Sequence, residues 1–456
     1  MSSNIRKTTV LVTGPILFFA ALLFSERLGW SRQEATVAGS TAWMLLWWFT
    51  EVIPLAATAL LPLVTFGGMG VLSSSELANA YSHPLIFLFL AGFFLARGVE
   101  HHQLHRRFAL AILRRFGSQS QRVLAGVMVA TFLLSLWMSN TATAVMMLPL
   151  TLSLIRHLPS KDELLERNIL LGMAWGANLG GLGTLIGTPP NLVYAAFQQQ
   201  ALGNEVNFLD WSLQIFPIAF ILLILAFALL RQNLPNVDLR DVQWPEAAAW
   251  TSGEKRVAGI FAATALAWMS RPWLQSLFPD IALTDTWVGL TGALLLFIVR
   301  DADRKPLLHW EDAQKIEWGI LLLFGGGMSL AAGMQASGWL QALADAPLQG
   351  WPPSLWVLAF TILGVWTTEL FSNMALVSGT LPVALAISAA QGIPFEHLAV
   401  PLTVGASCAF MLPMATPPNA IVFASGKIRI ADMARAGFWM NLCATVVIWL
   451  YCAYFL

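Results

Sequence analysis

Residues 135–141 read Ser-Leu-Trp-Met-Ser-Asn-Thr, and residues 187–191 read Gly-Thr-Pro-Pro-Asn. Both stretches interrupt long apolar segments with residues that break or polarise a helix. A matching pair follows in the second half of the chain, where residues 368–374 read Thr-Glu-Leu-Phe-Ser-Asn-Met and residues 415–419 read Ala-Thr-Pro-Pro-Asn. Such interruptions are typical of the re-entrant hairpins and broken helices of membrane transporters.

The spacing of these motifs indicates an internal duplication. Asn373 lies 233 residues after Asn140 (373 − 140), and Asn419 lies 228 residues after Asn191 (419 − 191). A nearly constant offset between several landmarks is the mark of a repeated unit. The sequence therefore predicts two copies of one unit, spanning about 50–200 and 285–430.

Composition places the chain in a membrane. It has 456 residues, of which 57% are hydrophobic and 11% charged, and its mean hydropathy is +0.67. Soluble domains carry roughly 25% charged residues. Apolar stretches recur along the whole chain, and roughly eleven crossings of about 20 residues remain when the interrupted regions are counted as half-elements. We expect an all-α polytopic protein of the lipid bilayer, and the net charge of zero indicates no nucleic-acid partner.

The basic residues predict how the two copies are oriented. One segment of the first copy carries Arg106, Arg107, Arg114, Arg115 and Arg122, whereas the corresponding segment of the second copy carries only Asp345. Basic connections face the cytoplasm, so the two repeats are expected to be inverted relative to each other. An odd number of crossings then places the N-terminus in the cytoplasm and the C-terminus outside, with the protein in the cell inner membrane.

The motif segments offer almost no Lys or Arg to neutralise a bound dianion at the bilayer midplane, where an uncompensated charge is costly. Helix N-termini and Ser, Thr and Asn side chains can donate hydrogen bonds to carboxylate oxygens instead. Carbonyl groups released where helices break, together with hydroxyl and amide oxygens, form the hard-oxygen shell that sodium accepts. The two repeats would supply matched sets of these atoms.

These residues resemble the signature of the divalent anion/sodium symporters, a family of carriers for succinate, citrate and sulfate. That signature is a Ser-Asn-Thr at a hairpin tip and a Thr/Ser-Pro-Pro-Asn at a broken helix in each repeat. The resemblance implies Na⁺ as coupling ion, with one site at Ser135, Ser139, Asn140 and the Gly187 carbonyl, and a second at Thr368, Asn373 and the carbonyls of Phe371 and Ala415. It implies substrate binding by Asn140, Thr141, Thr188, Asn373, Thr416 and Pro417.

One position departs from the family pattern, because Met374 stands where the second motif has a threonine. A thioether cannot donate a hydrogen bond. Losing one donor weakens the binding of one end of a dicarboxylate by about 1–3 kcal/mol if its partner is left unpaired. A sulfate/sodium symporter is therefore the competing assignment to a succinate carrier.

The resemblance also implies a homodimer that works as an elevator. The scaffold (dimerisation) domain would comprise residues 1–100 and 257–335, and the transport domain residues 122–230 and 353–456. Amphipathic connecting arms at 101–121 and 336–352 would join the two domains, and the polar stretch 231–256 would link the two halves of the chain.

Three other functions compete with symport. A sodium-independent dicarboxylate exchanger would keep the same fold. An intramembrane enzyme is disfavoured because no HExxH, nucleophile elbow or P-loop occurs in the chain, so we expect no enzymatic activity. A channel is disfavoured because inverted repeats with discontinuous helices indicate alternating access.

Two acidic residues and a histidine group lie apart from the motifs. Glu51 and Glu369 lie near apolar spans, where a carboxylate marks an ion pathway or is held by backbone N–H groups at a helix end. His101, His102 and His105 are interpreted as part of a solvated basic face rather than as metal ligands.

Overall fold

In a computed structural model, the described residues are 3–117, 119–156, 162–232, 234–235, 249–344 and 350–456. Within these ranges the regular elements are all α-helices, and the one β-bridge joins Arg300 to Pro306. The helices of the first half are α1 Ser3–Leu23, α2 Ser25–Leu28, α3 Arg32–Thr50, α4 Leu55–Thr58, α5 Leu61–Gly68, α6 Ser74–Tyr81, α7 Pro84–His101, α8 Leu104–Phe116, α9 Ser120–Ser135, α10 Asn140–Arg156, α11 Glu163–Leu182, α12 Pro189–Leu202 and α13 Phe208–Leu230. Those of the second half are α14 Ser252–Leu277, α15 Asp285–Ile298, α16 Trp310–Ala313, α17 Trp318–Ala336, α18 Trp339–Ala344, α19 Pro353–Thr367, α20 Asn373–Gln391, α21 Glu396–Ala406, α22 Pro417–Phe423 and α23 Ile430–Tyr454.

The expectation of a multi-span helical membrane protein is confirmed. Among the described residues, the helical segments long and apolar enough to cross a bilayer are Ser74–His101, Phe208–Leu230, Trp318–Ala336, Asn373–Gln391 and Ile430–Tyr454. Shorter apolar helices stand beside them, including α9 and α19. These two are the first arms of the expected hairpins, and their shortness suits elements that enter the membrane without crossing it.

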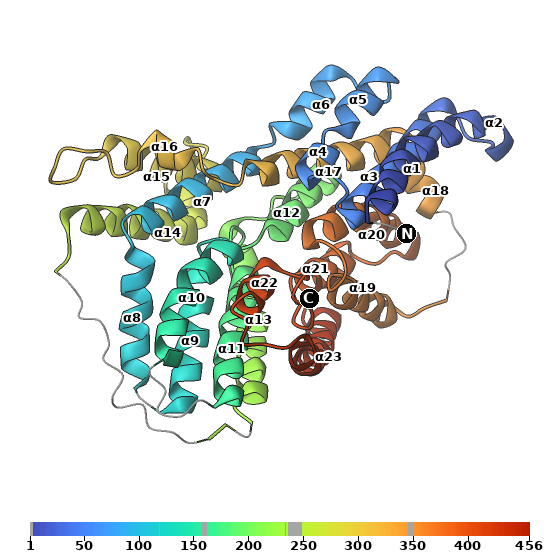
Figure 1. Cartoon of the computed structure of the whole chain (residues 1–456). Helices are drawn as coiled ribbons and strands as arrows, with labels where there is room; N and C mark the ends of the chain where they lie inside the picture. Colours follow the sequence, from blue (N-terminus) through green and yellow to red (C-terminus); the bar gives the residue numbers. More distant parts are fainter. Residues whose placement is uncertain (1–2, 118, 157–161, 233, 236–248, 345–349) are drawn as a thin grey trace.

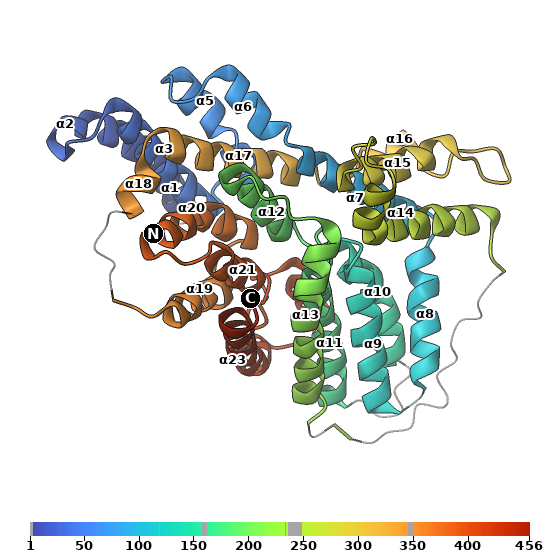
Figure 2. The same ribbon diagram turned by 180° about the vertical axis from the view of Figure 1, so that it is seen from behind.

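The helices form two packed groups (Figures 1 and 2). In the first group, α7 packs against α14 and α15, and α17 packs against α4 and α6. In the second, α9, α10, α11 and α13 stand side by side with α8 alongside, and α19, α21 and α23 pack together nearby. Helices α12 and α20 touch both groups, since each contacts α17.

Glycines allow each hairpin to lie directly on a broken helix. A Cβ on Gly180 of α11 would lie 2.3 Å from the carbonyl oxygen of Phe132 on α9. A Cβ on Gly364 of α19 would lie 2.7 Å from the carbonyl oxygen of Leu402 on α21. Only glycine permits such close backbone approach. The glycine belongs to the broken helix in the first repeat and to the hairpin arm in the second.

The two expected connecting arms differ in the structure. The first contains α8, which buries Leu104, Ala109 and Leu113 and packs against α9. Its apolar face therefore covers a protein surface. The second contains the short α18, and its residues 345–349 lie outside the described residues, as do 233 and 236–248 of the expected linker 231–256.

Candidate substrate and cation site

The tips of the two hairpins have the same hydrogen bond. Ser135 Oγ donates to Asn140 Oδ1 over 2.9 Å. Thr368 Oγ1 lies 2.7 Å from Asn373 Oδ1 and 2.6 Å from the Ala406 carbonyl oxygen, and these two acceptors share its one hydrogen. In both cases the donor is the hydroxyl residue at the end of the first arm and the acceptor is the first residue of the second arm. Both asparagine oxygens are thereby fixed next to a hydroxyl oxygen, which gives each tip a pair of hard-oxygen ligands.

The two helix breaks are also built alike. Asn191 Nδ2 donates to the carbonyls of Gly181 (3.0 Å) and Thr184 (2.8 Å), which lie ten and seven residues earlier. Asn419 Nδ2 donates to the carbonyls of Ala409 (3.2 Å) and Leu412 (3.1 Å), again ten and seven residues earlier. The asparagine of each Thr-Pro-Pro-Asn therefore satisfies carbonyls that the interrupted helix leaves without an N–H.

The threonines of the two motifs are N-cap residues that do not use their side chains as caps. Thr188 precedes α12 with φ −143° and ψ 143°, and Thr416 precedes α22 with φ −142° and ψ 152°. Neither hydroxyl accepts a capping hydrogen bond. The next two residues of each helix are prolines, which have no N–H. An anion at these helix starts would therefore rely on side-chain donors more than on backbone N–H groups.

The elements of one repeat meet those of the other at these breaks. Helix α10 packs against α22, and α20 packs against α12. Asn178 Nδ2 of α11 donates to Thr416 Oγ1 over 3.1 Å, and Gly181, one turn further along α11, lies against the Asn140 side chain. The last turn of α11 thus brings Asn140 of the first hairpin and Thr416 of the second break to one region.

The expected first sodium set converges in the structure. A Cβ on Gly181 would lie 2.3 Å from Asn140 Oδ1, and a Cβ on Gly187 would lie 2.6 Å from the Gly181 carbonyl oxygen. Asn140 and Gly187 therefore lie against Gly181, and Ser135 is joined to them through its hydrogen bond to Asn140. Ser139 is the residue before α10, where its Oγ accepts the Ala142 N–H over 3.2 Å.

The expected second sodium set is only partly gathered. Thr368 and Asn373 are bonded to each other, and Phe371, between them in the chain, packs on Phe49 with ring centroids 4.5 Å apart. Ala415 donates its N–H to the Leu412 carbonyl over 3.2 Å. Among the described residues no hydrogen bond connects Ala415 to Thr368 or Asn373.

The other expected substrate residues differ in exposure. Thr188 and Thr416 are buried at 3% exposure each, Thr141 is half-buried and Pro417 is exposed. Met374 is buried at 6% exposure. An apolar side chain is therefore buried at the position that directly follows Asn373.

Glu369 is held by donors on every side. Its Oε1 accepts the N–H groups of Phe410 (2.7 Å) and Met411 (2.9 Å) and Nδ2 of Asn441 (2.8 Å), and its Oε2 accepts the N–H of Leu412 (3.0 Å). A set made only of donors suits an ionised carboxylate. Glu369 thus ties the second hairpin to the second helix break.

Motif reasoning missed Asn178 and Asn441, and it left two roles open for Glu369. Asn178 and Asn441 stand alone inside apolar helices, so they look like ordinary interhelical contacts. The available signal was their type, since a buried amide in a membrane helix requires partners.

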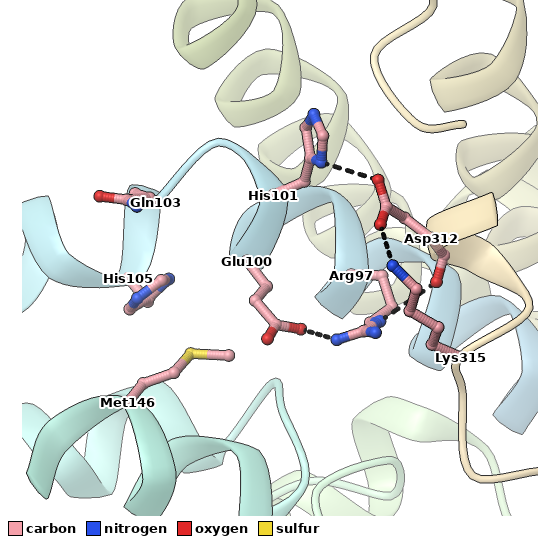
Figure 3. A pocket seen from close by; sticks show the side chains of 8 residues that line it. All are labelled: Arg97, Glu100, His101, Gln103, His105, Met146, Asp312 and Lys315. Carbon is pink, nitrogen blue, oxygen red and sulfur yellow. Dashed lines mark hydrogen bonds and ion pairs between the residues drawn. The ribbon is translucent and has the colours of Figure 1, made fainter. Parts of the chain in front are cut away.

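A cavity of about 420 Å³ lies elsewhere, where α7 and α16 face α10 (Figure 3). Its charges are paired, Arg97 with Glu100 and Lys315 with Asp312 (Nζ to Oδ1, 2.8 Å). The hydrogen bond from Lys315 keeps the pKa of Asp312 below its usual value. Met146 of α10 lines the cavity opposite these ion pairs. Because the charges satisfy one another, this cavity has no unmet charge for an anion.

The helical fold with two interrupted elements in each half defines a membrane transporter. Residues 45–405 match the family described as "Citrate transporter". The chain is 36% identical to the sodium-dependent dicarboxylate transporter SdcS of Staphylococcus saprophyticus, over 98% of this chain and 91% of that protein. It is 35% identical to SdcS of Staphylococcus aureus strain NCTC 8325, over 96% and 89% of the two chains. The chain therefore belongs to the divalent anion/sodium symporter family.

Solved structures agree on the fold. The YdaH transporter of Alcanivorax borkumensis superposes with a TM-score of 0.61 at 15% identity, covering 91% of this chain and 98% of that one. MtrF of Neisseria gonorrhoeae, from a class of antimetabolite efflux pumps, gives a TM-score of 0.54 at 12% identity, covering 86% and 85%. The family consists of transporters, which agrees with the expectation that the chain is not an enzyme.

Proposed function

We propose that this chain is a sodium-coupled symporter of a small divalent anion, with a C4-dicarboxylate such as succinate as its substrate. The relatives named sodium-dependent dicarboxylate transporters align over nearly the whole chain. The aligned region includes both hairpins and both helix breaks of this chain, which are the elements that would bind the anion and sodium.

The observation that carries the proposal is the repeated oxygen pair at the hairpin tips. Ser135 with Asn140 and Thr368 with Asn373 each offer a hydroxyl and an amide oxygen less than 3 Å apart. Oxygen ligands of this kind suit hard cations. A sodium ion at each tip would add positive charge beside the anion, which the motif segments themselves do not carry.

The mechanism that we propose is elevator transport by a homodimer of inverted repeats. In this mechanism residues 1–100 and 257–335 would form the scaffold, and residues 122–230 and 353–456 would form the transport domain. Both hairpins and both helix breaks fall within the proposed transport domain, so the whole anion site would move as one unit. The cavity of Figure 3, with α7 and α16 on one side and α10 on the other, lies between the two groups.

The test is uptake of radiolabelled succinate into proteoliposomes that contain the purified chain. We expect uptake under an inward sodium gradient, none with potassium in its place, and competition by unlabelled succinate. Empty liposomes provide the background.

Two other results would replace the proposal. Uptake only into vesicles preloaded with a dicarboxylate, without sodium, would identify an exchanger. Sodium-driven uptake of sulfate but not of succinate would identify a sulfate carrier, a result that the buried Met374 would explain by its missing donor.

A further inference from the structure

Asn178 joins the two repeats at the proposed anion site. Its side chain is fully buried, and Nδ2 lies 3.1 Å from the Ala409 carbonyl oxygen, 3.1 Å from Thr416 Oγ1 and 3.4 Å from Asn419 Oδ1. Asn178 stands on α11 of the first repeat, whereas all three acceptors belong to the break of the second repeat. This amide is therefore a direct contact between the repeats beside Thr416.

The orientation of the Asn178 amide is fixed by its neighbours. A backbone carbonyl can only accept, so the Ala409 oxygen requires an N–H. Asn419 uses its own Nδ2 on the carbonyls of Ala409 and Leu412, which leaves its Oδ1 toward Asn178. A flipped Asn178 would place its oxygen against both acceptors, so the NH₂ group must face the break.

This orientation determines the role left to the Thr416 hydroxyl. A hydroxyl has one hydrogen to donate and two lone pairs to accept. Because one lone pair accepts from Asn178, the hydrogen points elsewhere, and among the described residues Thr416 Oγ1 donates it to no protein acceptor. We infer that Asn178 is a positioning residue that sets the Thr416 hydroxyl as a hydrogen-bond donor to the substrate carboxylate. The inference rests on the proposed function, in which Thr416 contacts the anion.

Among the described residues, no side chain donates a corresponding hydrogen bond to the Thr188 hydroxyl. The offset of 228 residues between the two breaks places Ala406 opposite Asn178 in the second repeat (178 + 228). Ala406 has no side-chain donor, so it cannot act on Thr188 in this way. The second repeat is also the one with Met374 in place of a threonine. Asn178 thus keeps the Thr416 hydroxyl available as a hydrogen-bond donor in the repeat where methionine replaces the threonine at position 374.

The test compares Asn178→Asp, Asn178→Leu and Thr416→Val in sodium-driven succinate uptake by the full-length chain. In Asn178→Asp the new carboxylate oxygen accepts the hydrogen of the Thr416 hydroxyl. In Asn178→Leu no side-chain donor remains at position 178, so the orientation of that hydroxyl is no longer fixed. We expect Asn178→Asp and Thr416→Val each to raise the KM for succinate by about 10- to 100-fold, the range for a hydrogen bond to a charged group. Vmax and the sodium concentration for half-maximal uptake should stay at the reference values.

The double variants separate this role from a structural or purely electrostatic one. In the Thr416→Val background, Asn178→Asp and Asn178→Leu should raise the KM no further, because the hydroxyl on which Asn178 acts is gone. A further rise there would overturn the inference by showing that the new charge or a packing defect acts directly on the anion. If Asn178→Asp does not fold, Asn178→Leu gives the same comparison.

The remaining outcomes distinguish the inference from the function on which it rests. An unchanged KM in both Asn178 variants, alongside a raised KM in Thr416→Val, refutes the inference and leaves the proposed site standing. An unchanged KM in Thr416→Val refutes both the substrate role of Thr416 and the inference. No sodium-driven uptake by the unmodified chain refutes the proposed function, and the inference with it.

Discussion

Replacing the Glu369 carboxylate by an amide should loosen the second helix break. The carboxylate accepts four hydrogen bonds between 2.7 and 3.0 Å, three of them from consecutive backbone N–H groups. In Glu369→Gln one oxygen becomes an NH₂ group, which faces an N–H donor such as that of Leu412. One bond to a charged group is lost, worth about 1.5–3 kcal/mol, and the other three lose their charge assistance.

We therefore expect Glu369→Gln to lower the free energy of unfolding by about 2–4 kcal/mol, a large part of the about 5–15 kcal/mol that stabilises a folded domain. The effect should reach the site, because the Leu412 carbonyl accepts from Asn419 in the Thr-Pro-Pro-Asn motif. Loosening Leu412 should raise the KM for succinate as well. The assay is the thermal unfolding midpoint of the purified protein in detergent, followed by uptake kinetics in proteoliposomes.

Glu51→Gln is the matched control, since Glu51 is a second carboxylate near the apolar spans but is exposed. It should leave the unfolding midpoint unchanged. An unfolding midpoint of Glu369→Gln equal to that of the unmodified chain would refute the reasoning from these hydrogen bonds. A lower midpoint with unchanged uptake kinetics would refute only the link from Leu412 to the site.

Further predictions concern the hairpin tips. Asn140→Ala and Asn373→Ala should each abolish sodium-driven uptake while the purified protein keeps its elution volume in gel filtration; normal uptake by either variant would reject the site assignment. Met374→Thr should lower the KM for succinate by about tenfold, because a restored donor is worth about 1–3 kcal/mol, and an unchanged KM in uptake assays would show that position 374 does not face the anion. Gly181→Ala should weaken sodium activation of uptake, because its Cβ would lie 2.3 Å from Asn140 Oδ1. Gly259→Ala is the control, since a Cβ at that position would lie in open space. Equal sodium activation in both variants would count against the first cation site.

The sequence predicted the points where helices break more securely than the contacts made there. Proline and the Ser-Asn pairs act locally, so the Pro-Pro pairs alone place Thr188 and Thr416 at helix starts, where both residues lie. The partners of Asn191 and Asn419 could not be inferred in this way, because which carbonyls an interrupted helix exposes depends on the path of the chain through the break.

Contacts between residues far apart in the chain could not be predicted from the sequence for a similar reason. Glu369 bonds to residues 41 to 43 positions later, and Asn178 bonds to residues more than 230 positions later. Nothing in the local pattern around either residue encodes such a partner. For Glu369, the interpretation as a carboxylate held by backbone N–H groups agrees with the structure, although the N–H groups come from the second helix break rather than from the helix end at Glu369 itself.

The paired prolines at the start of α12 and α22 have a consequence for how this protein can diversify. Backbone donors are the same whatever the residue, so an anion held by them would be recognised alike in every descendant sequence. Here the prolines remove those donors from the first two positions of both helices, and under the proposed function recognition would pass to threonine and asparagine side chains. A carrier of this kind can acquire a new substrate through single codon changes while its architecture is inherited intact.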